Sequence, residues 1–126
     1  MKILVVEDDP TLLRMYELVL PDWSPAISLT LAKNGYEGLV RIGEIKPDLL
    51  ITDLMMPGID GFMMLQSLRA SRQLQSMNIV VVSGLSAAEI EERGGLPEDM
   101  PRFGKPIQFD KLEAHVRALL GERRAA

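Results

Sequence analysis

The sequence predicts an α/β fold in which helices cover both faces of a five-stranded parallel sheet. Five short strand-like runs alternate along the chain with segments that carry apolar residues at helical spacing. The clearest of these runs are apolar on both faces, which is typical of buried parallel strands. Such alternation indicates right-handed crossovers, with the connecting helices packed on both faces of one sheet.

The first strand is expected over residues 3–6, a continuous run of Ile-Leu-Val-Val that stops at three acidic residues. A helix is expected to follow at once. Asp9 can cap its N-terminus, and Pro10 suits its first position because proline has no backbone N–H to satisfy there. Pro21 is expected to end this helix.

A second, weaker strand is expected over residues 28–32, because the run is short. Asn34 can cap the second helix, and Pro47 is expected to stop it. The spacing of its apolar residues predicts that one face of this helix packs on the sheet. The residues expected on that face are Tyr36, Leu39, Val40 and Gly43.

A third buried strand is expected over residues 49–52, and a fourth over residues 78–82. Turn-forming residues over 56–61 predict a loop between the third strand and the next helix. Asp60 is expected to serve this loop or to cap that helix. The apolar residues at helical spacing in the helix are Phe62, Leu65 and Leu68.

The last part of the chain predicts a short helix near residues 86–93 and a fifth strand over 102–104, assigned mainly by its position. Asp110 can cap the final helix. A polar, frayed tail is expected from Gly121 onward. The residues expected to face the core from the final helix are Leu112, Val116, Leu119 and Leu120.

Composition excludes several classes of function. The 126 residues suit one domain, and 47% apolar with 25% charged residues is an ordinary globular balance. The absence of cysteine excludes disulfides, thiolate metal sites and a cysteine nucleophile, and one histidine excludes a multi-histidine metal site. A net charge of −4 argues against nucleic-acid binding. With no apolar run of membrane-spanning length and no signal-like N-terminus, we expect a cytoplasmic protein.

Polar side chains gather where the expected strands end. The carboxyl ends of parallel strands form the edge at which such sheets bind their ligands. A single polar residue at one strand end could simply cap that strand. Capping alone is a poor explanation for polar residues at four of the five strand ends. The set comprises Glu7, Asp8, Asp9, Asp53, Ser83 and Lys105.

These residues predict a magnesium site and a nucleophile. The turn after the first strand is acidic and lacks the glycine-rich patterns that bind nucleotides. Carboxylates without histidine or cysteine favour Mg²⁺, and we infer that Asp8 and Asp53 hold it, with Glu7 acting partly through water. Asp53 can also attack phosphorus to give an aspartyl phosphate. Mg²⁺, Lys105 and Ser83 would then each bind one phosphoryl oxygen.

Four motifs occur in order along nearly the whole chain: ILVVEDDP at 3–10, PDLLITDLMMPGIDG at 47–61, VVVSG at 80–84 and GKP at 104–106. With these motifs the chain resembles the receiver domain of bacterial response regulators, the phospho-accepting module of two-component signalling. The resemblance implies a flavodoxin-like, doubly wound (βα)5 fold with strand order 2-1-3-4-5. It also implies a receiver domain over residues 1–121, followed by a C-terminal tail over 122–126.

The resemblance implies a role for each residue at the strand ends, and a cis bond between residues 105 and 106, where proline permits it. The matched positions are Asp53 as phospho-acceptor and metal ligand, Asp8 as direct Mg²⁺ ligand, Glu7 as its partner through water, Met55 as donor of a backbone carbonyl to the metal, Ser83 as switch hydroxyl and Lys105 as phosphoryl contact.

Three positions depart from the family pattern or specialise it. The family usually has Tyr or Phe three residues before the lysine, but this chain has Arg102 there, with Phe103 next to it. The usual aromatic switch and the usual dimer face are therefore not implied, and we expect a monomer or a weak homodimer. Met55 and Leu85 occupy the family positions that influence the hydrolytic water. Because neither side chain can orient water, the sequence predicts slow self-dephosphorylation.

The resemblance implies a signalling switch that modifies itself and is not an enzyme with a separate substrate. A histidine kinase or phosphotransfer protein would donate the phosphoryl group, and an unidentified effector would respond. Two alternatives stay open. A Mg²⁺-dependent phosphatase or phosphotransferase usually has a second Asp two residues after its nucleophile, where this chain has Met55. A phosphorylation-independent binding module would not need the complete set of polar residues. Binding of nucleic acid or membrane by this segment is not expected.

Overall fold

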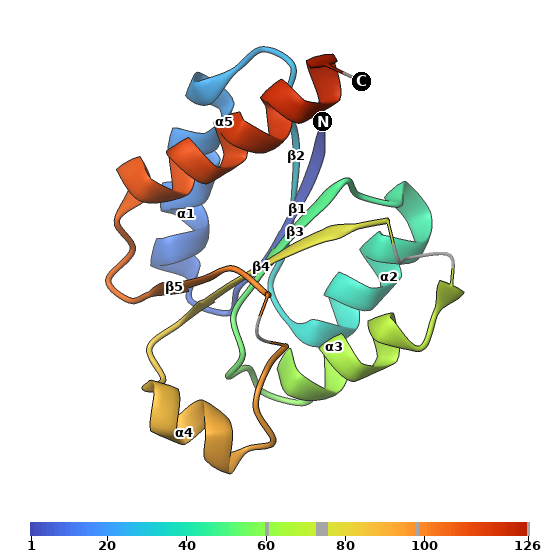
Figure 1. Ribbon diagram of the computed structural model, residues 1–126, viewed down its shortest axis with the longest axis vertical. Helices are drawn as coiled ribbons and strands as arrows, with labels where there is room; N and C mark the ends of the chain where they lie inside the picture. Colours follow the sequence, from blue (N-terminus) through green and yellow to red (C-terminus); the bar gives the residue numbers. More distant parts are fainter. Residues whose placement is uncertain (60, 73–75, 98, 126) are drawn as a thin grey trace.

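The computed structural model is an α/β fold with one parallel sheet between two layers of helices (Figure 1). The structure describes residues 1–59, 61–72, 76–97 and 99–125, and side chains up to residue 122. The strand order is β2-β1-β3-β4-β5, and every neighbouring pair is parallel. The predicted fold class and strand order are therefore confirmed. The strands are β1 (Lys2–Val6), β2 (Ser28–Ala32), β3 (Leu49–Thr52), β4 (Asn78–Ser83) and β5 (Arg102–Gly104).

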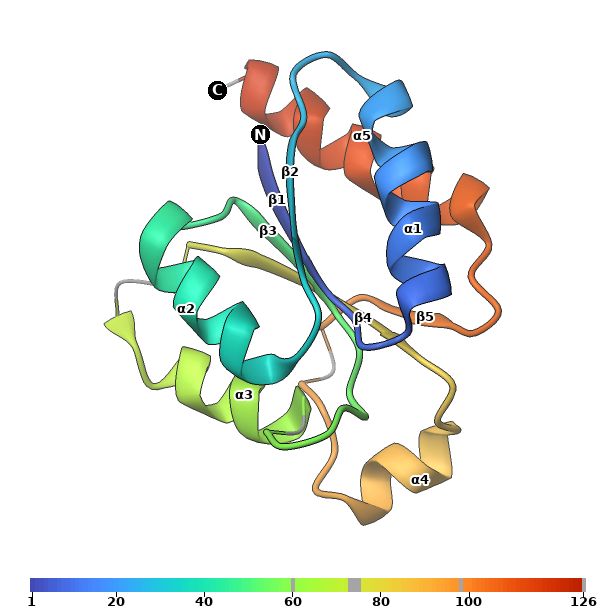
Figure 2. The ribbon, with the colours of Figure 1, turned by 180° about the vertical axis from the view of Figure 1, so that it is seen from behind.

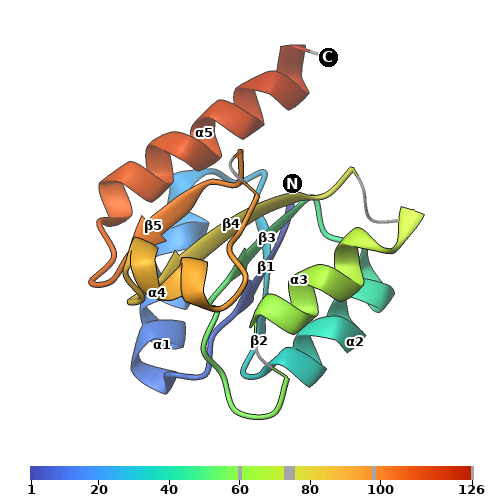
Figure 3. The same ribbon diagram turned by 60° about the horizontal axis from the view of Figure 1, so that its bottom comes forward.

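Two hydrophobic cores lie on opposite faces of the sheet. Helices α1 and α5 cover one face, and α2 and α3 lie side by side on the other (Figures 2 and 3). Alternate residues of β1 serve the two cores, since Leu4 and Val6 join one cluster while Ile3 and Val5 join the other. The helices are α1 (Pro10–Val19), η1 (Leu20–Trp23), α2 (Gly35–Ile45), α3 (Gly61–Arg69), α4 (Ala87–Glu92) and α5 (Phe109–Ala125).

The side chains predicted to cap the N-termini of α1 and α2 do so in the structure. The Asp9 carboxylate accepts the backbone N–H of Thr11 at 2.9 Å, and the Asn34 side chain accepts that of Glu37 at 2.8 Å. Ser86 caps α4 in the same way and forms a reciprocal capping box with Glu89. Asp60 lies outside the described residues.

Helical structure does not end at Pro21. The 3₁₀ helix η1 follows α1 directly and contains Pro21 in its first turn. The α-helix itself ends at Val19, just before Pro21, as predicted. The proline is tolerated in η1 because a residue in a first helical turn needs no backbone N–H.

Helix α2 packs on the sheet through Ile42, Leu39 and two glycines, and not through Tyr36 or Val40. Gly43, which was also expected on the packed face, is exposed. The side chains of Tyr36 and Val40, expected to be buried, are 59% and 57% exposed. The buried positions include Gly35 and Gly38. A Cβ atom on Gly38 would lie 2.8 Å from a methyl group of Val6, so the missing side chain lets the helix approach β1 closely.

Helix α5 buries the predicted side chains but differs at both ends. The carbonyl of Gln108 accepts the N–H of Leu112 at 3.2 Å, so the helix begins at Phe109 and Asp110 lies inside the first turn. Its carboxylate still suits the positive end of the helix dipole. The fraying expected from Gly121 onward is not found in the backbone, since the helix continues through Gly121 to Ala125. One glycine costs only about 1 kcal/mol in a helix whose neighbours favour that state. Along the described parts of the chain, no helix is both long and apolar enough to cross a membrane.

Candidate functional site

The sheet ladder places Glu7 and Asp53 side by side. Val6 is paired with Thr52 in the register of β1 and β3, and one more backbone hydrogen bond extends the ladder, from the N–H of Asp53 to the carbonyl of Val6 at 3.1 Å. Glu7 follows directly after β1, and Asp53 follows directly after β3. The two carboxyl groups therefore lie at the same edge of the sheet, where the loops after β1, β3 and β4 emerge (Figure 1).

Three carboxylates meet at this edge. Glu7, Asp8 and Asp53 each offer an oxygen, and these oxygens lie within 4.8 Å of one another. Glu7 and Asp53 are buried, at 1% and 6% exposure, whereas Asp8 is exposed. Hard oxygen donors beside solvent fit Mg²⁺, which takes few protein carboxylates and keeps several waters. The donor set therefore fits the predicted cation.

Lys105 joins two of the carboxylates. Its Nζ donates to Oε1 of Glu7 at 2.8 Å and to Oδ2 of Asp53 at 2.9 Å. Gly104 is paired with Ser83 in the register of β4 and β5, so the lysine leaves the sheet at the same edge as the acids. The peptide bond from Lys105 to Pro106 is cis, as predicted.

The Asp53 carboxylate is fixed from two sides. Its Oδ1 accepts the backbone N–H of Leu54 at 2.6 Å and that of Met55 at 3.3 Å. Its Oδ2 accepts from Lys105. Charge-assisted hydrogen bonds of this kind hold a carboxylate in one orientation.

Gly61 supports this arrangement, although the sequence pattern indicates only a turn there. Its N–H donates to the carbonyl of Leu54 at 2.8 Å. A Cβ atom at this position would collide with the backbone of Asp53 and Leu54. The residue at the start of α3 must therefore be glycine if the Asp53 loop is to keep its place. The signal was present as the last residue of the loop motif, but sequence alone did not show what it touches.

Both oxygens of Glu7 are engaged, by Lys105 and by the N–H of Asp9 at 3.1 Å. Burial raises the pKa of Glu7 above its ordinary value, and these two hydrogen bonds only partly oppose the rise. Burial also acts to lower the pKa of Lys105, but its hydrogen bonds to Glu7 and Asp53 outweigh that effect and leave the pKa raised. Lys105 is thus held as a cation between two acids.

Ser83 and the neighbouring positions complete the edge. Ser83 is buried at the end of β4, and its hydroxyl oxygen accepts the N–H of Leu85 at 3.1 Å. A Cβ atom on Gly84 would lie 3.9 Å from Cβ of Lys105, which places this turn beside the lysine. Met55 is 42% exposed, and Leu85 packs partly into the core.

The two residues at the departure from the family pattern point to opposite faces of β5. The ring of Phe103 meets the ring of His115 edge-on at 6.0 Å, on the α1 and α5 face. Arg102 instead lines a hollow beside α4. Consecutive residues of a strand point to opposite faces of the sheet. Phe103 therefore does not take the place of the Tyr or Phe that the family usually has at position 102.

Comparison with known proteins gives a consistent picture. A family model described as the response regulator receiver domain matches residues 3–117. The chain is 33% identical to response regulator Rre1 of Synechocystis sp., over 98% of this chain and 53% of that protein. It is 32% identical to the transcriptional regulatory protein AfsQ1 of Streptomyces coelicolor, over 96% of this chain and 52% of the relative. The chain thus spans about half the length of these curated relatives.

Solved structures resemble the whole domain. The signal receiver domain of a DNA-binding response regulator from Colwellia psychrerythraea 34H has a TM-score of 0.82 at 26% identity, covering 96% of this chain and 98% of that one. The receiver domain of a signal transduction histidine kinase from Syntrophus aciditrophicus has a TM-score of 0.83 at 26% identity, covering 96% and 90%.

Proposed function

The chain belongs to the response regulator receiver family, the signalling domain of two-component systems, and on that premise we propose that Asp53 accepts the phosphoryl group. The observation that carries the proposal is the contact set of its carboxylate. One oxygen is held by backbone N–H groups and the other by Lys105, and Glu7 and Asp8 lie within 4.8 Å. A nucleophile fixed in this way needs little beyond positioning and charge neutralisation.

The proposed step is a direct transfer. A carboxylate oxygen of Asp53 forms a bond to phosphorus while the bond from phosphorus to the donor's leaving atom breaks. Lys105 stays protonated and stabilises the oxygens that carry charge. Ser83 would turn its hydroxyl from the N–H of Leu85 towards the transferred group.

Asp8 and Asp53, together with the backbone carbonyl of Met55, would hold Mg²⁺, and Glu7 would contribute through water. The cation, when bound, would neutralise the charge between these carboxylates and the incoming phosphoryl group. Both oxygens of Glu7 already accept hydrogen bonds, which supports an indirect role for it.

The proposed phosphoryl donor is a histidine kinase or a histidine phosphotransfer protein. Family members serve different outputs, since the relatives include DNA-binding response regulators and a hybrid signal transduction histidine kinase. The effector that responds to this chain is therefore left unspecified. We also propose that the protein acts in the cytoplasm, as a monomer or a weak homodimer, and turns over no separate substrate.

Incubation with Mg²⁺ and acetyl phosphate tests the proposed function. We expect intact mass spectrometry to find one added phosphoryl group per chain, and we expect EDTA to prevent the addition. Continuous release of inorganic phosphate well above the slow decay of the modified protein would instead support a phosphatase. No modification in the presence of Mg²⁺ would support a phosphorylation-independent binding module.

The lifetime of the modified protein should depend on Met55 and Leu85. The double variant Met55→Asn with Leu85→Glu is expected to lose its phosphoryl group about fivefold faster, because one hydrogen bond to the attacking water is worth about 1 kcal/mol. Decay is followed by intact mass after removal of the donor. The double variant Met55→Leu with Leu85→Met keeps both positions apolar and should decay like the parent. Equal decay of all three proteins would refute the shielding role.

A further inference from the structure

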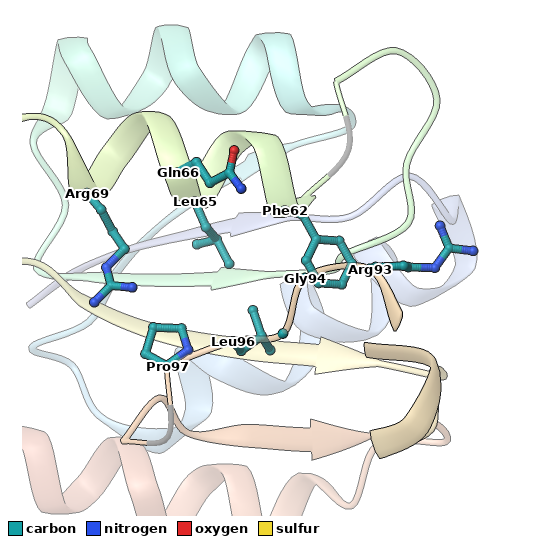
Figure 4. A pocket seen from close by; sticks show the side chains of 9 residues that line it. Phe62, Leu65, Gln66, Arg69, Arg93, Gly94, Leu96 and Pro97 are labelled. Atoms are coloured by element: carbon teal, nitrogen blue, oxygen red, sulfur yellow. The ribbon is translucent and has the colours of Figure 1, made fainter. Parts of the chain in front are cut away.

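A groove separates α3 from the segment that joins α4 to β5 (Figure 4). Its volume is about 350 Å³, at the lower end of the range for ligand pockets. None of the residues at the acidic edge of the sheet lines it. Its apolar floor is formed by Phe62, Leu65, Leu96 and Pro97.

Two arginines stand at the ends of this groove. Figure 4 shows Arg69 at one end and Arg93 at the other, with the apolar residues between them. Both arginines are exposed, and neither guanidinium group makes a hydrogen bond or an ion pair with any residue that the structure describes. By contrast, three other arginines pair with a glutamate on their own helices: Arg14, Arg41 and Arg117.

The rim is thus cationic in a protein whose net charge is −4. The carboxylate of Glu91 comes near Gly95, 3.3 Å from where a Cβ atom would lie, but Glu91 lines the neighbouring hollow with Arg102 and not this groove. Gly94 has a positive φ of 109°, and a Cβ atom there would meet nothing within 4 Å. The groove is therefore open to solvent on that side.

We propose that this groove binds a short acidic segment of a partner protein. One large apolar side chain of the segment enters between Phe62 and Leu96, and carboxylates on either side of it meet Arg69 and Arg93. The planar guanidinium group suits carboxylates because it can donate two parallel hydrogen bonds. An apolar centre with a polar, solvent-accessible rim is the usual anatomy of a docking site.

A synthetic peptide in which a Phe-Leu pair is flanked on each side by two glutamates tests the proposal. We expect this peptide to shift the amide resonances of Gly94, Gly95 and Leu96 in the NMR spectrum of the full chain. Arg69→Glu and Arg93→Glu should each weaken binding by about tenfold, since reversing a charge adds repulsion to the lost attraction. Higher salt should weaken binding to the parent protein.

Arg72→Glu is the matched control. It makes the same change of net charge three residues from Arg69, at a position that does not line the groove, and should bind like the parent. The proposal is overturned if the control loses as much affinity as Arg69→Glu, or if a peptide with lysines in place of the glutamates binds equally well. It is also overturned if phenylacetate alone shifts the same resonances with the same affinity, because a small acid would then be the better occupant.

Discussion

Replacing Asp53 with asparagine is expected to abolish phosphorylation completely. Asparagine has nearly the same shape, and its side-chain oxygen can still accept the N–H of Leu54, which bonds to Asp53 at 2.6 Å. The amide nitrogen cannot act as the nucleophile, and the change removes one of the three carboxylates that converge at this edge. Intact mass after incubation with Mg²⁺ and acetyl phosphate measures the effect.

A second aspartate variant separates this loss from a general effect of charge. Asp22 lies in η1, away from the carboxyl ends of the strands, and Asp22→Asn makes the same chemical change there. We expect this protein to be modified like the parent. Phosphorylation of Asp53→Asn at the parental level would show that another residue is the acceptor. Circular dichroism should find both variants folded.

Much of the fold was predictable because its signals are local. Caps such as Asp9 and Asn34 act on N–H groups two or three residues away, and a run such as 49–52 shows by its composition alone that both of its faces are buried. The face of α2 was not predictable in this way. Its contact with β1 depends on the absence of a side chain at Gly38. A pattern of apolar side chains at helical spacing cannot identify such a position, because glycine contributes no side chain to the pattern.

The sequence could predict which residues lie together at the candidate site, but not which of their atoms contact one another. In any parallel sheet of this order, the strand ends bring Asp53 and Lys105 to one edge. The residue types at the strand ends were therefore enough to predict that both belong to the site. The engagement of both Glu7 oxygens and the contact of Gly61 with the Asp53 loop depend on atomic positions that no spacing encodes. The same holds for the groove, whose two arginines lie 24 residues apart and in no recognisable motif.

The second large effect concerns Lys105, whose replacement by methionine is expected to lower the free energy of unfolding by about 3 kcal/mol. Glu7 is 1% exposed, and Lys105 is the only cation that contacts it among the described residues. Breaking a buried pair by removing one partner costs several kcal/mol, because the other charge stays buried without compensation. The value belongs at the low end of that range, since the lysine side chain itself is 27% exposed.

Urea unfolding in EDTA measures this loss, because a bound cation would stabilise the folded state and obscure the comparison. Lys111→Met, on the exposed surface of α5, removes the same charge and should change stability little. The double variant Lys105→Met with Glu7→Gln should recover much of the loss, since a neutral amide at position 7 no longer needs the lysine. If Lys105→Met unfolds at the same urea concentration as Lys111→Met, the pair between Glu7 and Lys105 does not stabilise the fold. If only the recovery fails, the loss comes from the contact between Lys105 and Asp53.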